Sequence, residues 1–293
     1  RSTKEFGQNS AYICGEASGT FCNRFNYAGG RYVFIDGLDY EPKLADITGY
    51  AVSTGFERTG HFECSNELLN RIYETDLWTF RANTVNGVTM DCPHRERLGY
   101  GEVAWATAWG CGLPNYRAGA FYTHMVRNWC DVQHEDGSIW FVTPHMRYTW
   151  GGTLWSSAPV TISWEMYRQY GDTRVLAQAY PTYKRWMAFL ESKVSGGVLT
   201  QYIKSRGRFL GDWAAPQGRK EWSGSTEALL FNNCVYALDL KMMTDIAGAL
   251  GKEDDAARYA GQLDALRTNI HRRFFDATQN VYIDARQVHL AFP

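Results

Sequence analysis

Three carboxylates and two arginines crowd into one short stretch of the sequence. Asp91, Glu96 and Glu102 are interleaved there with Arg95 and Arg97. Cleavage of a glycosidic bond needs one protonated carboxyl group for the leaving oxygen and one ionised carboxylate to activate water or attack the sugar. Neighbouring acids drive their pKa values apart by repulsion, and an arginine keeps selected members charged. The stretch therefore suits acid–base chemistry on a sugar, and its members could also bind sugar hydroxyls.

An ion-pair cluster that caps a helix would have the same composition. Pro93 and Gly101 break the pattern, so residues 91–101 are predicted to form a loop or a broken first turn. A helix is then expected from about Glu102 to Gly110. The residues alone leave both interpretations of the cluster open.

Composition narrows the class of protein. The chain has 293 residues, 45 % of them apolar and 21 % charged, which fits one large globular domain or a domain with an appendage. The net charge of −1 gives no basic stripe, so nucleic acid is not an expected partner. The sequence contains no run of about 18 apolar residues, so it predicts no membrane span. Aromatic residues reach 15 %, and their rings either fill a large core or stack on sugars.

Cysteine and histidine patterns predict no metal site and no cofactor. The seven cysteines are an odd number without a CxxC pair, and the histidines lack HExxH spacing. Buried free thiols are expected, and a single disulfide such as Cys14–Cys22 stays open. Residues 1–9 lack the apolar core of a signal peptide. The oligomeric state and the compartment are left undetermined, with the periplasm or the cell exterior favoured over the cytoplasm.

Hydrophobic periodicity divides the chain in two. Tyr32–Ile35 and Ile47–Thr54 are β-rich runs that predict the end of a β-domain. From a cap at Ser65 the apolar residues recur at helical spacing, and about seven helices are expected before another starts near Ala285. Sequential helical hairpins without a short repeat favour an α/α toroid over a solenoid.

Two long connections, residues 131–157 and 195–225, are rich in tryptophan and include Trp155 and Trp213. Loops of this length in a compact helical domain are usually functional or disordered, and disordered segments are poor in aromatic residues. We therefore expect both connections to be ordered and to build the site.

Residues 91–100, DCPHRERLGY, resemble the signature of bacterial α-L-rhamnosidases of glycoside hydrolase family 78. Four further stretches resemble family motifs and occur in the family's order, so the resemblance covers nearly the whole chain. They are residues 25–33, 60–65, 164–172 and 211–216.

The resemblance implies an (α/α)6 barrel, incomplete here, over residues 59–293, preceded by the end of a β-sandwich domain over residues 1–58. It also implies inverting hydrolysis of terminal α-L-rhamnosides, so a carbohydrate L-rhamnoside is the expected partner. Glu96 matches the family's general acid, and Asp91 matches an acid that binds rhamnose hydroxyls. The other matches to pocket residues are Arg95, Tyr100 in place of a frequent Trp, Trp155, Asp212 and Trp213.

The chain departs from the family pattern in two motifs and in length. The family commonly has an extra residue and an Asp where this chain has Gly101-Glu102. The longer Glu102 side chain is expected to bring its carboxylate to the same place, as a second catalytic candidate. Trp155 is followed by Ser156-Ser157, where many relatives carry Gly-Asp or Gly-Gly, so a different substrate preference is expected. The family's base is a Glu on later barrel helices, which we expect beyond residue 293, with this chain a partial copy.

Two other functions fit the same residues. An α/α barrel can host a polysaccharide lyase, for which Tyr100 or Tyr148 would be the base. A barrel without its later helices could also be a non-catalytic sugar-binding fragment. An unsaturated product would favour the lyase, and sugar binding without turnover would favour the fragment.

Overall fold

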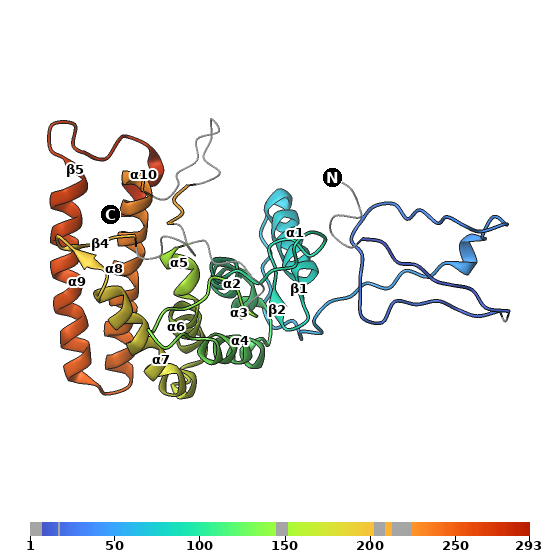
Figure 1. The fold of residues 1–293 in the computed structure, drawn as a ribbon, viewed down its shortest axis with the longest axis horizontal. Helices are drawn as coiled ribbons and strands as arrows, with labels where there is room; N and C mark the ends of the chain where they lie inside the picture. Colours follow the sequence, from blue (N-terminus) through green and yellow to red (C-terminus); the bar gives the residue numbers. More distant parts are fainter. Residues whose placement is uncertain (1–7, 17, 145–151, 202–208, 213–223) are drawn as a thin grey trace.

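The structure, a computed structural model, describes residues 8–16, 18–144, 152–201, 209–212 and 224–293. Helices dominate this part of the chain, and the irregular segment that precedes the first long helix runs away from them (Figure 1). The prediction of a mainly helical fold is confirmed.

Helix α1 spans Glu67–Asn83. Its N-cap is Asn66, one residue after the predicted Ser65, and the Asn66 side chain accepts hydrogen bonds from the backbone N–H groups of Leu68 and Leu69. Asn and Ser are both good caps because a short side-chain oxygen reaches the free N–H groups of the first turn. The predicted helix is present, with its start moved by one residue.

A two-stranded hairpin follows α1. Strand β1 (Thr84–Val85) pairs antiparallel with β2 (Val88–Thr89). Asn86 and Gly87 between them both have positive φ, 57° and 78°, which is the conformation of a tight two-residue hairpin turn. The hairpin leads into residues 91–100, which we call the acidic loop.

Helix α2 (Gly101–Thr107) follows the acidic loop, where the sequence predicts a helix from about Glu102. It continues as one π-helical turn, Ala108–Gly112. Further along, α6 ends at Gly171, whose positive φ of 66° is the left-handed cap expected from the sequence. The helices of this part are α3 (Leu113–Asn115), α4 (Gly119–Asp131), α5 (Thr153–Ser156), α6 (Ala158–Tyr170) and α7 (Arg174–Glu191).

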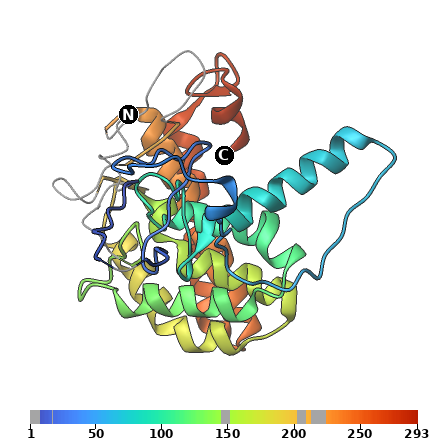
Figure 2. The ribbon, with the colours of Figure 1, turned by 90° about the vertical axis from the view of Figure 1, so that its right-hand side faces the viewer.

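Helices α8 (Thr226–Ala249) and α9 (Glu253–Phe274) form a long hairpin and lie side by side in both views (Figures 1 and 2). Two small hairpins flank this pair and precede a short terminal helix. They are β3 (Val194–Ser195) with β4 (Val198–Leu199), and β5 (Phe275–Asp276) with β6 (Val281–Tyr282), before α10 (Gln287–Ala291).

Two hydrophobic clusters position the candidate site. The large one fills the space between the helices and buries many of the aromatic rings, including those of Trp129, Trp186 and Tyr183, so much of the aromatic content is core. The smaller one lies where the acidic loop meets α5, and we call it the loop cluster. Its buried members are Leu98, Phe141, Val142, Trp155 and Leu210.

The sequence predicts strands before residue 58, but the described residues of this segment form none. Their one regular element is a 3-10 turn at Leu44–Asp46. Tyr32, Val33 and Phe34 are 75 %, 83 % and 88 % exposed. A strand is stable only beside a neighbour that takes its hydrogen bonds and covers its apolar face. The described residues give this run neither, so its β-propensity is not realised and no β-sandwich is seen.

All seven cysteines are free, so the disulfide left open for Cys14 and Cys22 is not formed. Cys111 and Cys234 are buried as expected, whereas Cys14 and Cys22 are exposed. Within the described ranges, no helix combines the length and the apolar character needed to cross a membrane.

Candidate active site

Hydrogen bonds join the two ends of the acidic loop and connect the loop to the N-terminal segment. The Asp91 N–H donates to the Leu98 carbonyl at 3.2 Å. Arg97, with a positive φ of 58°, turns its guanidinium back onto the loop and donates to the Pro93 carbonyl at 3.0 Å. The same guanidinium donates to the Asn26 side chain and the Tyr27 carbonyl, both at 2.7 Å. The loop therefore has a defined shape, and the motif at residues 25–33 helps to hold it.

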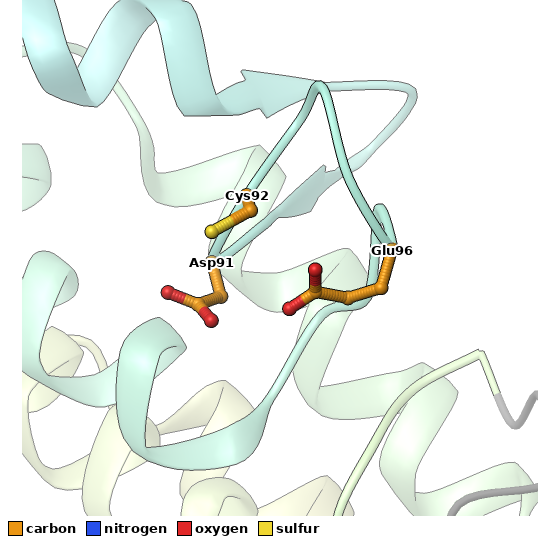
Figure 3. A group of neighbouring side chains, drawn as sticks. All are labelled: Asp91, Cys92 and Glu96. Atoms are coloured by element: carbon orange, nitrogen blue, oxygen red, sulfur yellow. The ribbon is translucent and has the colours of Figure 1, made fainter. Parts of the chain in front are cut away.

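Arg95 bridges two of the predicted site acids. Its guanidinium donates to both carboxylate oxygens of Glu96, at 2.8 Å for Oε1, and to Asp91 Oδ2 at 3.2 Å. Figure 3 shows the Asp91 and Glu96 carboxyl groups facing each other across the loop. The Glu96 side chain is 16 % exposed and that of Asp91 is 45 % exposed. One cation thus serves two acids, which are brought together as the sequence predicts.

The two acids have different proton affinities. Burial raises the pKa of Asp91 above its usual value, and the negative charge of Glu96 raises it further. Burial acts in the same direction on Glu96. It is outweighed by the hydrogen bonds and charge of Arg95 together with hydrogen bonds from the Glu96 backbone and from Asp91, so the pKa of Glu96 lies below its usual value. Their unequal affinities match the separation expected for a cluster of acids around an arginine.

Asp91, Cys92 and Glu96 each bring one potential metal-ligand atom within 4.8 Å of the others (Figure 3). The Arg95 guanidinium already binds both of these carboxylates. Burial raises the pKa of the Cys92 thiol, which works against the thiolate that a metal requires. The group therefore fits an ion-pair cluster better than a metal site.

Glu102 lies in the first turn of α2 and carries the most strongly perturbed carboxyl group near the acidic loop. Burial raises its pKa to about 8, although hydrogen bonds from its own backbone N–H and from the Trp155 indole favour the charged form. Its Oε2 atom is buried without a hydrogen-bond partner among the described residues. At neutral pH this carboxyl group is protonated, so it can donate a hydrogen bond.

Trp155 is 7 % exposed and packs in the loop cluster rather than on an open surface. A Cβ atom at Gly101 would clash with the Trp155 carbonyl oxygen, so glycine is required at the start of α2. Only this close approach lets the backbone of α5 reach the first turn of α2. The prediction that Trp155 contacts a sugar stays a prediction, and its contacts here are with core residues and Glu102.

The remaining predicted residues lie on different elements. Tyr100 is the N-cap residue of α2, forms an isolated bridge with Val142 and packs against the loop cluster. Asp212 lines a cavity of about 190 Å³ together with apolar side chains of α8 and α10. Trp213 and Tyr148 lie outside the described residues.

Two polar residues on α8, Asn232 and Asp239, are fully buried and were not predicted as candidate residues from the sequence. Asp239 Oδ2 accepts hydrogen bonds from Ser157 Oγ at 2.5 Å and from the Trp186 indole at 3.1 Å. Burial raises the pKa of Asp239 to about 7. A polar residue inside an apolar helical run is the signal that could have found them, because such a residue is retained only with partners.

Solved α-L-rhamnosidase structures share this fold. That of Dictyoglumus thermophilum aligns with 82 % of this chain and 26 % of its own, with a TM-score of 0.72 and 29 % identity. That of Streptomyces avermitilis, complexed with L-rhamnose, aligns with 77 % of this chain and 20 % of its own, with a TM-score of 0.64 and 26 % identity.

Comparison with known protein sequences also finds α-L-rhamnosidases. The α-L-rhamnosidases of Alteromonas sp. (strain LOR) and Streptomyces avermitilis are 26 % and 30 % identical to this chain over 92 % of its length. The chain spans 29 % and 24 % of these two proteins. Residues 57–293 match the family described as the bacterial α-L-rhamnosidase six-hairpin glycosidase domain. This chain therefore belongs to the family of bacterial α-L-rhamnosidase six-hairpin glycosidase domains.

Proposed function

We propose that this chain supplies the acid side of an α-L-rhamnosidase site that releases terminal α-L-rhamnose with inversion. The observation that carries the proposal is the bridge from Arg95 to Asp91 and Glu96, on a loop whose shape is fixed by Arg97. Inverting hydrolysis needs a protonated carboxyl group on one side of the bond and a base on the other.

Glu96 is the proposed proton donor to the leaving oxygen. Arg95 keeps Glu96 ionised, so the guanidinium must leave it before it can act as an acid. A sugar hydroxyl near Arg95 would draw the guanidinium away, and the sugar would exclude water from Glu96. Burial by itself favours a higher pKa for Glu96. Loss of the Arg95 hydrogen bonds would therefore raise this pKa and favour the protonated carboxyl group.

The neighbouring residues have proposed binding roles. Asp91 and Arg95 hold rhamnose hydroxyls, and the protonated Glu102 donates a further hydrogen bond. Tyr100, Trp155, Asp212 and Trp213 are proposed to complete the walls of the pocket. The domain division at residue 58 is retained as part of the same proposal.

The base is proposed to come from outside residues 1–293. Among the described residues, Asp239 is the other carboxyl group with a strongly raised pKa, but it is fully buried and hydrogen-bonded to core side chains. It cannot activate a water at a sugar. Family membership favours hydrolysis over the elimination catalysed by a lyase.

The test uses the protein in its natural full length and an alkyl α-L-rhamnoside, whose leaving oxygen needs a proton. NMR of the first-formed product should show β-L-rhamnose, and the Glu96→Gln variant should lose about 10²–10⁴-fold in kcat. First-formed α-L-rhamnose would reject inversion, an unsaturated product would favour the lyase, and undiminished turnover would reject Glu96. Calorimetry with L-rhamnose that shows binding without any turnover would favour a sugar-binding protein.

A further inference from the structure

Helix α8 carries polar side chains on a face that packs in the core. Asn232 and Asn233 are both fully buried. A buried amide costs free energy unless its donors and acceptor are all used, so its partners indicate which segments it holds. Asn232 joins two segments that carry predicted site residues, whereas Asn233 joins α8 to a strand that carries none.

Three hydrogen bonds occupy the Asn232 amide. Its Oδ1 accepts the Thr153 N–H at 2.8 Å. Its Nδ2 donates to the Leu210 carbonyl at 3.0 Å and to the Ala228 carbonyl of its own helix at 2.7 Å. Thr153 begins the helix that carries Trp155, and Leu210 precedes Asp212 by two residues. One side chain therefore ties both site-bearing segments to α8.

Asn232 also supplies a cap that α5 lacks. The N-cap residue of α5 is Gly152, which has no side chain to accept the free N–H groups of the first turn. A Cβ atom at Gly152 would lie 2.5 Å from Asn232 Oδ1, and the φ of 116° is one that other residues rarely adopt. Glycine at position 152 thus lets the cap come from another helix.

The position of α5 in turn fixes the surroundings of Glu102. The Trp155 indole lies beside the Glu102 carboxyl group and lowers its pKa. The Trp155 carbonyl oxygen lies so close to Gly101 that a Cβ atom there would clash with it. Trp155 and Leu210 share the loop cluster. One hydrogen bond of Asn232 ends on Leu210 itself, and another ends on Thr153, two residues before Trp155. A shift of α5 would open the contact between Trp155 and the first turn of α2.

We propose that Asn232 is a positioning residue of the active site, which holds the Trp155 and Asp212 segments in register and thereby keeps water from the Glu102 carboxyl. This inference rests on the proposed function, because it is the proposed function that places Trp155, Asp212 and Glu102 in the active site. The contacts themselves, and their effect on Glu102, do not depend on the substrate.

The titration of Glu102 reports on this arrangement. Burial is the largest cause of its raised pKa, ahead of the hydrogen bonds that favour the charged form. The nearby charged group that acts on it is Asp91, which lies on the acidic loop and raises the pKa further. Release of α5 admits water to Glu102, so its pKa falls even though the indole hydrogen bond is lost.

Asn233 is the matched control. Its Oδ1 accepts the Leu199 N–H at 2.7 Å, and its Nδ2 donates to the Leu199 carbonyl at 3.0 Å and to the Leu229 carbonyl at 2.9 Å. It has the burial and the number of bonds of Asn232, but it holds strand β4. Its removal should cost similar stability and leave Glu102 unchanged.

The experiment compares the Asn232→Ala and Asn233→Ala variants of the full-length protein by ¹³C NMR of labelled glutamate, with the Glu102 signal identified by its loss in Glu102→Gln. Both variants should melt at similarly lowered temperatures. Only Asn232→Ala should lower the Glu102 midpoint, by at least about one pH unit. An unchanged midpoint in Asn232→Ala, or an equal fall in Asn233→Ala, would overturn the proposal.

A second variant covers the case in which Asn232→Ala does not fold. Gly152→Ala strains the same cap from the α5 side with Asn232 intact, and it should lower the Glu102 midpoint in the same direction; an unchanged midpoint would overturn the proposal. The result is separable from catalysis. A lowered midpoint together with full activity of Glu96→Gln would uphold the positioning role and reject the proposed function.

Discussion

The indole of Trp155 lies beside the carboxyl group of Glu102 and lowers its pKa. The two side chains come from α5 and from the first turn of α2, and the absence of a side chain at Gly101 lets these elements meet. The Trp155 side chain is largely buried, and burial is the largest cause of the raised pKa of Glu102. A tryptophan that matches a pocket aromatic by sequence is therefore also one of the groups that act on the pKa of a neighbouring acid.

Replacement of the indole should move the pKa of Glu102 upward. Phenylalanine keeps most of the buried ring but cannot donate, so Trp155→Phe removes a bond that favours the charged carboxylate. We expect the pKa to rise above about 8, measured by ¹³C NMR of labelled glutamate. Trp164→Phe, whose ring packs on Tyr167, is the control and should leave Glu102 unchanged. A fall in Trp155→Phe would mean that the ring does not shield the carboxyl group.

Asp239 should make the protein less stable as the pH rises from about 4 to about 7. The unfolded carboxyl group titrates near the ordinary Asp value of about 3.9, whereas the folded one titrates at about 7. Between these values the folded state binds the extra proton, so deprotonation favours unfolding, by up to about 4 kcal/mol in all. Asp239→Asn stays neutral and should lose this pH dependence, as followed by urea unfolding at several pH values.

Asp172→Asn is the control of opposite sign. The exposed Asp172 carboxylate accepts hydrogen bonds from Arg174, which lower its pKa to about 2, so its contribution is present above the ordinary Asp pKa and is lost on acidification. A stability profile of Asp239→Asn that parallels the unmodified protein between pH 4 and pH 7 would contradict the account of Asp239.

Alanine at position 101 should destabilise the protein. Its methyl group would clash with the Trp155 carbonyl oxygen and force α2 and α5 apart, which costs on the order of 1–3 kcal/mol or more. Thermal unfolding measures this. Gly110→Ala is the matched control, because no atom lies within 4 Å of a Cβ there and its effect should stay within about 1 kcal/mol. Equal melting temperatures for the two variants would contradict the close contact at Gly101.

Removal of the bridging cation should raise the pKa of Glu96. The hydrogen bonds and the positive charge of Arg95 lower the pKa of Glu96, so this pKa should rise in Arg95→Met. The ¹³C signal of Glu96, identified with Glu96→Gln, follows it. Arg97→Met removes the bonds to the N-terminal segment instead and should mainly lower the melting temperature. A pKa of Glu96 that is unchanged in Arg95→Met would refute the bridge.

Local chemistry made the helices predictable. The observed N-cap of α1, Asn66, lies one residue after the predicted one, Ser65. Gly171 has the left-handed conformation that its place after a periodic run predicts. The small hairpins were not predicted, although Asn86-Gly87 and Gly196-Gly197 are turn signals. Two-residue strands carry no detectable alternation, so the turn residues were the available sign.

Long-range contacts were the part that the sequence could not supply. The acidic loop places Asp91 and Glu96 together because they are neighbours in the chain, and this proximity was predictable from the sequence. Trp155 meets Glu102, and Asn232 caps α5, only through the packing of distant helices. The strand predicted at Tyr32–Ile35 was wrong because a strand needs a partner, and the residues of the strand cannot specify that partner.

The leaving-group dependence of the Glu96→Gln variant tests the central claim most directly. A dinitrophenyl α-L-rhamnoside needs no protonation on departure, whereas an alkyl α-L-rhamnoside does. If Glu96 is the general acid, the full-length Glu96→Gln variant should keep most of its kcat/KM on the dinitrophenyl substrate and lose about 10²–10⁴-fold on the alkyl substrate. Equal losses on both substrates, with the selective loss found instead in Glu102→Gln, would contradict this assignment.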